Sequence, residues 1–272
     1  MIPRRTHVAL VALFSIALAA PAPSLGAASA KGTLEVFAAA SLSDAFNELA
    51  RKLESQRPGL AVRINFAGSQ QLVAQLEQGA AADVFASADE RWMSYAKAQG
   101  LVDGDPSTFA HNQLVVIVPK TNPARIGKLQ DLAKGGIKLV LAADAVPVGH
   151  YSRTVLRNLS RADGFPGDYA TRALRNVVSE EENVKSVVSK VQLGEADAGI
   201  VYRSDITPAV SRYVRELEIP ASANVTATYP IAMLKQSPSS DAAKAFIDLV
   251  LSADGQRVLA QHGLMPVASN SP

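Results

Sequence analysis

Cysteine is absent from this chain of 272 residues. Without thiolates the chain forms no disulfide bond, no cysteine-ligated metal site and no cysteine nucleophile. A chain of this length can be stabilised by its hydrophobic core alone, so an exported protein would not require disulfides. We expect a freely soluble mature protein that carries no lipid-modified N-terminal cysteine.

The sequence also has few of the motifs by which enzymes are recognised. The histidines His111, His150 and His262 show no spacing typical of metal ligands. No serine lies in a G-x-S-x-G motif, and no loop resembles a Walker or a dinucleotide-binding sequence. We therefore expect a protein that is not an enzyme and that needs no cofactor.

The first thirty residues have the layout of a cleavable signal peptide. Arg4 and Arg5 are followed by an apolar run over residues 8–20, and Ala28-Ser29-Ala30 is a typical cleavage signal of small residues. The apolar run is short for a membrane span, which needs about 20 residues. We predict that residues 1–30 are removed and that the mature protein lies in the periplasm.

The predicted mature chain has a formal net charge of zero. Residues 1–30 contain two arginines and no acid, so 25 basic residues remain against 25 acidic ones. Nucleic acids and anionic membranes select for basic surfaces. We therefore expect no nucleic-acid partner and no membrane surface as the main ligand.

Short apolar segments alternate with amphipathic helices along the chain. Strands are predicted at 33–38, 61–66, 83–86, 114–119, 138–142, 198–202 and 225–234. Helices are predicted at 43–56, 70–78, 90–99, 129–133, 151–159, 168–176, 184–193, 240–251 and 254–262. Such alternation predicts an α/β fold, here with two lobes that each hold a mainly parallel sheet flanked by helices.

Four segments run from a strand or loop directly into a helix, three of them through small residues. They are Ala38-Ala39-Ala40-Ser41, Ala67-Gly68-Ser69, Val146-Pro147-Val148-Gly149 and Glu180-Glu181-Glu182-Asn183-Val184. A helix N-terminus offers unpaired backbone N–H groups and a partial positive charge, and parallel sheets bind ligands where their strands end. If these ends meet in one cleft, they can hold a small oxyanion without a lysine, an arginine or a metal.

Each residue at these junctions also has an ordinary structural interpretation. Ser41 with Asp44 resembles a capping box, and Ser69 is a plausible cap for the helix that follows it. Val148 and Val184 would contribute only backbone N–H groups, in a tight turn and at a helix start. A further residue, Tyr202, ends a predicted strand, where its hydroxyl either donates to a ligand or simply packs at the edge of the core.

The chain resembles the periplasmic molybdate-binding proteins of ABC importers, which belong to the type II periplasmic binding proteins. The motifs that carry the resemblance are Phe37-Ala38-Ala39-Ala40-Ser41-Leu42, Ala67-Gly68-Ser69, Ala82-Asp83-Val84-Phe85-Ala86-Ser87-Ala88-Asp89, Val146-Pro147-Val148-Gly149, Gly199-Ile200-Val201-Tyr202-Arg203-Ser204-Asp205 and Gly263-Leu264-Met265-Pro266. Each motif is weak alone, but together they follow the expected order over nearly the whole mature chain.

The resemblance implies two lobes joined by two hinge strands, near residues 112–114 and 225–229. Lobe 1 would comprise residues 31–112 and 225–272, and lobe 2 residues 113–224. The implied partners are molybdate, tungstate and an ABC permease of the inner membrane, and we expect a monomer.

The resemblance also implies the ligand contacts. Ser41 and Ser69 would each give a backbone N–H and a hydroxyl, Val148 and Val184 a backbone N–H, and Tyr202 its phenol hydroxyl. All of them would bind the oxygen atoms of molybdate, so that no residue coordinates the metal centre directly. The family usually has alanine where this chain has Val148; the backbone donor survives that change, and the added bulk bears on the width of the cleft.

Two other functions are compatible with the residues. A receptor for sulfate or an organic acid is one, and a carboxylate ligand would favour an arginine clamp from Arg153 or Arg203. An extracytoplasmic hydrolase is the other, with Ser41 or Ser69 as nucleophile. The hydrolase would need His111 or His150 as its general base, and no motif places either histidine beside a serine.

Overall fold

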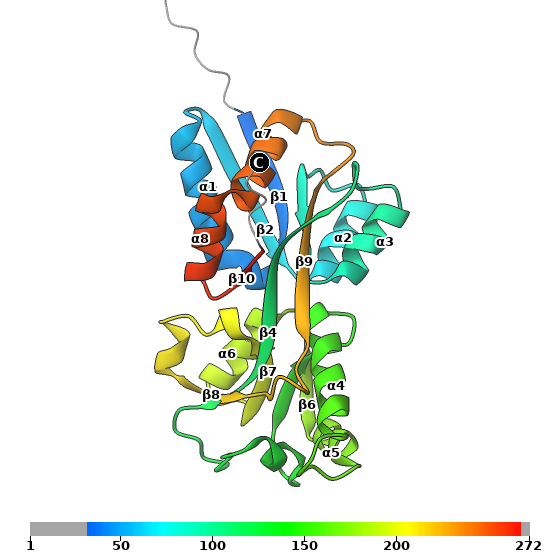
Figure 1. Cartoon of the computed structure of the whole chain (residues 1–272), viewed down its shortest axis with the longest axis vertical. Coiled ribbons are helices and arrows are strands. Elements are labelled where there is room, and N and C mark those ends of the chain that lie inside the picture. Colours follow the sequence, from blue (N-terminus) through cyan, green and yellow to red (C-terminus); the bar gives the residue numbers. More distant parts are fainter. Residues whose placement is uncertain (1–31, 268–272) are drawn as a thin grey trace, which may run out of the picture. The chain divides into compact units, whose positions relative to one another are not determined.

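The first lobe is built from a β-α-β-α-β-α series (Figure 1) in the computed structural model, which describes residues 32–267. Its elements are β1 (Gly32–Ala39), the short helix η1 (Ala40–Leu42), α1 (Ser43–Gln56), β2 (Leu60–Ala67), α2 (Ser69–Glu77), β3 (Val84–Ala86) and α3 (Glu90–Ala98). Strand β1 pairs in parallel with both β2 and β3. The carboxyl ends of these strands therefore lie at one edge of the sheet, where η1 and α2 begin.

Two long strands connect the lobes. Strand β4 (Ser107–Pro119) pairs with β9 (Thr226–Met233) through Gln113, and then pairs with β7 and β8 from Leu114 onward. The change of partner falls inside the predicted hinge segment 112–114. In Figure 1, β4 and β9 run side by side from one lobe toward the other. The predicted lobe boundaries at 112/113 and 224/225 stay a prediction.

The second lobe repeats the arrangement of the first. It contains η2 (Leu129–Ala133), β5 (Leu139–Ala142), α4 (Pro147–Leu159), α5 (Tyr169–Arg175), β6 (Val177–Glu181), α6 (Val184–Gln192), β7 (Ala198–Tyr202), η3 (Arg203–Asp205), η4 (Val210–Arg212) and β8 (Val214–Glu218). Strand β5 pairs in parallel with β6 and β7, while β7 and β8 run antiparallel to β4. The carboxyl ends of β5, β6 and β7 lead into α4, α6 and η3.

The chain then returns to the first lobe with β9, α7 (Ser240–Leu251), α8 (Ala253–Gln261) and the short strand β10 (Met265–Pro266). The main path through the sheet is β2-β1-β3-β9-β4-β7-β5-β6, with β8 and β10 paired to β4. Parallel pairs thus come from the β-α-β series, and the two connecting strands add the antiparallel ones.

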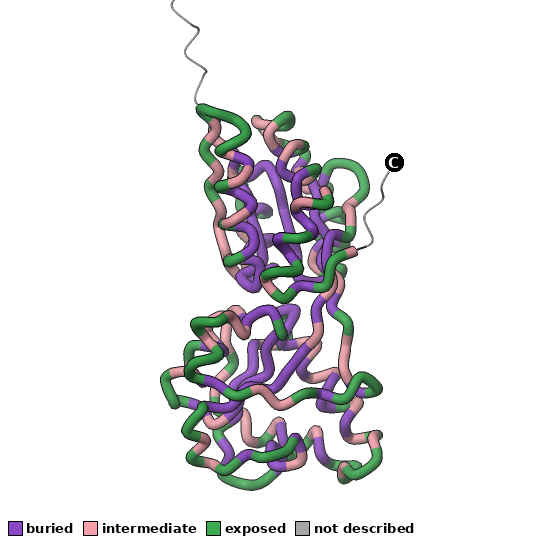
Figure 2. Tube along the Cα trace, turned by 60° about the vertical axis from the view of Figure 1, so that its left-hand side comes forward, coloured by how far each residue is buried: buried purple, intermediate pink, exposed green. Residues whose placement is uncertain are grey.

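The buried segments lie in the interior of each lobe, as Figure 2 shows in purple, and they include the central strands. Central strands such as β5 and β7 are apolar and buried along their whole length, as expected for a sheet covered on both faces. Helix α1 turns a stripe of apolar residues inward, which comprises Ala45, Phe46, Leu49, Ala50 and Leu53. Removal of this apolar surface from water is the main force that holds each lobe together.

Most predicted elements are present within a few residues of their predicted bounds. No strand is predicted at β6 or at the two-residue β10, and there are three further differences. No strand is predicted between residues 203 and 224, yet β8 lies there; it is short and carries charged side chains, as edge strands often do. Strand β4 begins seven residues before its predicted start, and α4 begins at Pro147 rather than at residue 151. The predicted signal peptide lies outside the described residues. No helix of segment 32–267 is long and apolar enough to cross a bilayer.

Candidate functional site

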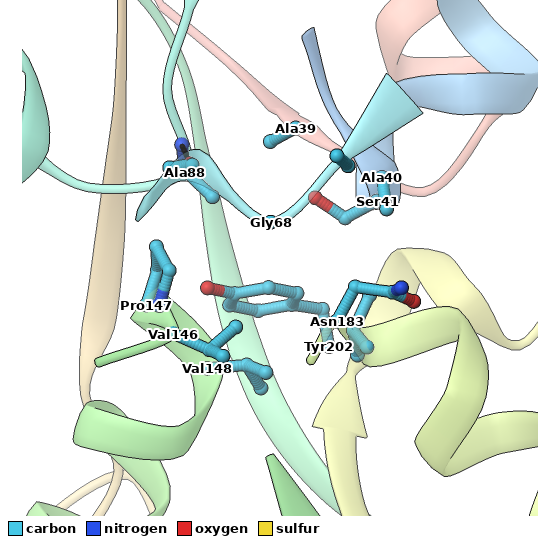
Figure 3. A pocket seen from close by; sticks show the side chains of 13 residues that line it. Ala39, Ala40, Ser41, Gly68, Ala88, Val146, Pro147, Val148, Asn183 and Tyr202 are labelled. Atoms are coloured by element: carbon cyan, nitrogen blue, oxygen red, sulfur yellow. Dashed lines mark hydrogen bonds between the residues drawn. The ribbon is translucent and has the colours of Figure 1, made fainter. Parts of the chain in front are cut away.

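A small cavity lies where the strand ends of both lobes meet (Figure 3). Its lining residues are Ala39, Ala40, Ser41, Ala67, Gly68, Ser69, Ala88, Val146, Pro147, Val148, Asn183, Val184 and Tyr202. The accessible volume of the cavity is only about 10 Å³. Pockets for drug-sized ligands usually measure about 300–1,000 Å³, so this cavity suits a guest of a few atoms. All five residues predicted to bind the oxyanion line it.

Ser41 reaches the cavity from the end of β1, in the middle of η1. The predicted capping box is wrong: the residue before α1 is Leu42, and no side chain caps that helix. The buried hydroxyl of Ser41 instead lies 3.1 Å from the hydroxyl of Tyr229. Because Ser41 is in the first turn of η1, its backbone N–H has no acceptor within that helix. Ser41 therefore presents an N–H and a hydroxyl at the same place.

Ser69 makes the equivalent contribution after β2. It is the first residue of α2 rather than its cap, since Gly68 occupies the cap position. The Ser69 hydroxyl is fully buried and accepts a hydrogen bond from the backbone N–H of Ala88 at 3.1 Å. A hydroxyl that accepts through its oxygen keeps its single proton for another acceptor. The Ala88 contact thus leaves that proton free for a ligand.

Val148 is the second residue of α4, and its N–H is one of the unpaired donors at that helix N-terminus. Pro147 occupies the first helical position, where its missing N–H is not needed. Gly149 follows, and a Cβ at this position would collide with the carbonyl oxygens of Ala142 and Ala143. The absence of that side chain lets the start of α4 pack directly against the end of β5.

Val184 begins α6 as predicted, after the cap residue Asn183. The Asn183 side chain accepts a hydrogen bond from the backbone N–H of Ser186 at 3.0 Å. This contact satisfies the third N–H of the helix and leaves that of Val184 without an acceptor inside the helix. The side chain of Val184 is buried, so only its backbone is available to a polar ligand.

Tyr202 supplies a side-chain donor that is not fully used within the protein. It ends β7 and is only 1% exposed, and its hydroxyl makes no hydrogen bond of normal geometry with the described residues, although the Tyr229 hydroxyl lies near enough to contribute to its raised pKa. In Figure 3 the hydroxyls of Ser41 and Tyr202 both face the cavity. Burial raises the pKa of Tyr202 well above its ordinary value, so the phenol stays protonated and remains a donor at physiological pH.

The cavity therefore concentrates hydrogen-bond donors and excludes charge. None of its thirteen described lining residues has an ionisable acid, lysine, arginine or histidine side chain. Four helix N-termini approach the cavity, those of η1, α2, α4 and α6, and each adds a partial positive charge. Within the described segment no three histidine or acidic residues are placed to hold a metal ion. Such a site is suited to an anion with several oxygen atoms.

The residues needed for the two other functions lie elsewhere. Arg153 donates to the carbonyl oxygens of Ala142 and Gly149, and Arg203 pairs with Glu216 and Glu218, so neither arginine lines the cavity.

The hydrolase hypothesis also lacks its base. His150 contacts Asp144 and His111 contacts Thr228, and neither histidine lines the cavity. The protein contacts of the Ser41 and Ser69 hydroxyls are with Tyr229 and with the backbone N–H of Ala88, and neither is with a histidine that could activate them.

Hydrogen bonds join the lobes on both sides of the cavity. On one side, the indole N–H of Trp92 and a guanidinium N–H of Arg91 donate to the carbonyl oxygen of Ala145, at 2.7 and 2.8 Å. On the other side, the amide of Gln70 donates to the carbonyl oxygen of Glu182 at 2.9 Å. These contacts connect the two lobes beside the cavity.

Two polar residues that support the site are not evident from the sequence. Tyr229 on β9 and Asn112 on β4 are fully buried, and the Asn112 amide donates to the Tyr229 hydroxyl at 3.3 Å and to the Ser204 hydroxyl at 2.8 Å. This chain of contacts fixes the Tyr229 hydroxyl beside that of Ser41. Both residues lie inside long extended segments with no local motif to mark them.

Comparisons with known proteins agree with this geometry. A family model described as bacterial extracellular solute-binding protein matches residues 34–265. Molybdate-binding protein ModA of Mycobacterium tuberculosis is 39% identical over 241 residues, which cover 89% of this chain and 86% of that protein.

Solved structures show the same fold. The periplasmic molybdate-binding protein of Azotobacter vinelandii has a TM-score of 0.74 at 23% identity, over 86% of this chain and all of the other. The sulfate-binding protein SubI of M. tuberculosis has a TM-score of 0.77 at 18% identity, over 87% of both chains. Since proteins named for different oxyanions share the fold, the fold alone does not select the ligand.

Proposed function

The chain belongs to the bacterial extracellular solute-binding proteins, and on that premise we propose that it binds molybdate in the cavity between its lobes. Members of such a family are binding proteins of transport systems, not enzymes. The oxygen atoms of the dianion would accept hydrogen bonds from the backbone N–H groups of Ser41, Ser69, Val148 and Val184. The hydroxyls of Ser41, Ser69 and Tyr202 would complete the set.

One observation carries the proposal: the buried Tyr202 hydroxyl makes no hydrogen bond of normal geometry with the described residues and faces a cavity that helix N-termini line. A buried hydroxyl left without a hydrogen bond destabilises a protein by about 1–3 kcal/mol. An oxyanion in the cavity would accept that bond and remove the penalty. The other donors converge on the same space, which makes an oxygen-rich anion the ligand they fit best.

A neutral site is physically sufficient for a doubly charged ligand. Hydrogen bonds to an ionised acceptor are roughly twice as strong as those between neutral groups. A buried arginine or lysine would bring its own desolvation penalty, which a well-hydrogen-bonded anion does not need to offset. The anion loses hydrogen bonds to water when it binds, and protein donors that are already fixed in place replace them.

Selection against sulfate would come from the size of the cavity. Molybdate and tungstate are larger tetrahedra than sulfate, and donors fixed at the larger spacing cannot all reach the smaller ion. Each buried donor left unpaired would cost about 1–3 kcal/mol. The same argument predicts that molybdate and tungstate bind with similar affinity.

The proposal extends to transport. We propose that the mature protein is a periplasmic monomer whose lobes close on the ligand and that it delivers the ligand to an ABC permease. Residues 31–112 and 225–272 would move as one lobe against residues 113–224, with β4 and β9 as hinge strands. Ligand-linked closure of two lobes about such strands is a known mode of conformational change.

Native mass spectrometry with a panel of oxyanions tests the proposal. Ligand-free protein is mixed with molybdate, tungstate, sulfate and phosphate in equal amounts, and the bound mass is read directly. We expect one molybdate or tungstate per chain and no sulfate or phosphate. Preferential capture of sulfate would show that the ligand is wrong, and no capture of any anion would show that the site is wrong.

A further inference from the structure

We infer that Lys185, held between Asp44 and Asp205, is a positioning residue that couples closure of the lobes to the arrangement of the oxyanion donors. The Lys185 ammonium lies 3.2 Å from Asp44 Oδ2 and 3.3 Å from Asp205 Oδ1. This inference rests on the proposed function of the cavity, and it concerns residues that do not line it.

The placement of Lys185 is unfavourable for its own helix. It is the second residue of α6, where the partial positive charge of the helix N-terminus disfavours a cation. Burial also disfavours the charged ammonium, but the two carboxylates outweigh burial and raise the pKa of Lys185. Local helix stability therefore does not account for this lysine, whereas its contacts with Asp44 and Asp205 do.

The three residues are each next to a proposed ligand donor. Lys185 directly follows Val184, Asp44 comes three residues after Ser41, and Asp205 comes three residues after Tyr202.

Asp205 is the best anchored of the three. It is fully buried, and its Oδ2 accepts the backbone N–H of Tyr202 at 3.2 Å. One ammonium thus ties together the segments that carry three of the five proposed binding residues.

Only one arm of this cluster crosses between the lobes. Asp205 and Lys185 both belong to lobe 2, on η3 and α6, and their contact persists when the lobes separate. Asp44 lies in the first turn of α1 in lobe 1, and its side chain is 49% exposed. Lobe opening would therefore break the Asp44–Lys185 pair while leaving the buried carboxylate of Asp205 paired.

This geometry allows the interlobe ion pair to be removed without disturbing the pair between Lys185 and Asp205. Asp44→Asn removes the interlobe arm and leaves Lys185 paired with Asp205, so no buried charge is left alone. The matched control is Asp254→Asn in the first turn of α8, which removes a 3.0 Å ion pair with Lys52 and a second pair with Arg257, both inside lobe 1. The two aspartates have similar exposure, 49% and 42%. Asp44→Glu tests whether another carboxylate at this position restores the ion pair with Lys185 and its effect on lobe closure.

The first readout is the dissociation rate of molybdate, followed by stopped-flow tryptophan fluorescence. An ion pair made only in the closed state slows ligand release, so Asp44→Asn should release molybdate about two- to fivefold faster, with little change in the association rate. Asp254→Asn should behave like the wild type, and Asp44→Glu should recover part of the loss. Concentrated salt screens the Asp44–Lys185 ion pair. It should therefore reduce the difference in molybdate dissociation rate between wild type and Asp44→Asn.

The second readout does not depend on the identity of the ligand. The chain has no cysteine, so Ser55→Cys on α1 and Ser189→Cys on α6 allow specific spin labelling of one exposed position in each lobe. In ligand-free protein, electron–electron distance measurements should show longer distances with Asp44→Asn than with wild type or Asp254→Asn.

The two readouts separate the inference from the proposed function. Failure of the wild type to bind molybdate would end the proposed function and leave the distance measurement to test the closure role. Equal release rates and equal distance distributions in wild type and Asp44→Asn would overturn the inference even if molybdate binds.

Discussion

The indole N–H of Trp92 donates a hydrogen bond to the carbonyl oxygen of Ala145 at 2.7 Å, which joins α3 of lobe 1 to the loop before α4 in lobe 2. Trp92 is also the only tryptophan of the chain. Because Trp92 contacts both lobes, the intrinsic fluorescence of the protein should report changes in the relative position of the lobes.

We therefore expect molybdate to shift the tryptophan emission to shorter wavelength, saturating at one anion per chain, because closure moves the indole out of water. Trp92→Phe should abolish the signal but weaken binding no more than about tenfold, since one neutral hydrogen bond contributes about 0.5–1.5 kcal/mol. Fluorescence and calorimetric titrations of the same samples check this. Calorimetric binding without any change of emission would contradict the expected closure.

Removal of the Tyr202 hydroxyl should have opposite effects on stability and on binding. Tyr202→Phe eliminates a buried hydroxyl that makes no hydrogen bond of normal geometry within the protein, so the free energy of unfolding should stay equal or rise by about 1 kcal/mol. Affinity for molybdate should fall by about 1.5–3 kcal/mol, because a charge-assisted hydrogen bond is lost. Urea unfolding with and without molybdate measures both quantities. A variant that is destabilised yet binds normally would contradict the role given to the hydroxyl.

Ser69→Ala should weaken both stability and binding. The substitution leaves the buried N–H of Ala88 without its acceptor, at a cost of about 1–3 kcal/mol, and it removes a ligand donor. Ser152→Ala is a suitable control, since Ser152 is also fully buried but does not line the cavity; its hydroxyl donates to the carbonyl oxygen of Val148, whose N–H is the atom assigned to the ligand. The control should lose stability alone, as measured by thermal unfolding and calorimetric titration. Loss of molybdate affinity in Ser152→Ala equal to that in Ser69→Ala would argue against a direct contact.

Asp205 should make part of the stability depend on pH. Burial raises the pKa of Asp205 from 3.8 to about 6, while Lys185 partly opposes the shift. The folded state then binds this proton more tightly than the unfolded chain does. The contribution of Asp205 to the free energy of unfolding is therefore greatest below pH 3.8 and is lost as pH rises through about 6.

Carboxyl-carbon NMR of ligand-free protein should show this carboxyl titrating near pH 6, and Lys185→Met should move the titration to higher pH. A pKa of Asp205 at or below 3.8 would contradict the burial seen here.

Local pattern was enough to predict the donors of the site. Ser69, Val148 and Val184 lie at helix starts that the flanking glycine, proline and asparagine mark in the sequence. Tyr202 was predicted because an apolar strand ends there. Whether these residues bind a ligand stays a prediction, but their meeting in one cavity follows from the way parallel strands end at one edge of a sheet.

Contacts between distant segments could not be predicted in the same way. The hydroxyl of Ser41 is held by Tyr229, 188 residues further along the chain, and its spacing to Asp44 wrongly favoured a capping box. No sequence pattern indicates the role of Lys185 either, since only the fold brings it to Asp44, 141 residues away. Strands β6 and β8 were missed because charged edge strands lack the apolar alternation by which strands are recognised.

The most direct test of the central claim is calorimetric titration of ligand-free wild-type protein and Tyr202→Phe with molybdate and with sulfate. Uncharged donors spaced for a large oxyanion predict tight one-to-one binding of molybdate to the wild type, clearly weaker binding to the variant, and no measurable heat with sulfate. Equal affinity for both anions, or molybdate binding that is unchanged in Tyr202→Phe, would contradict the account.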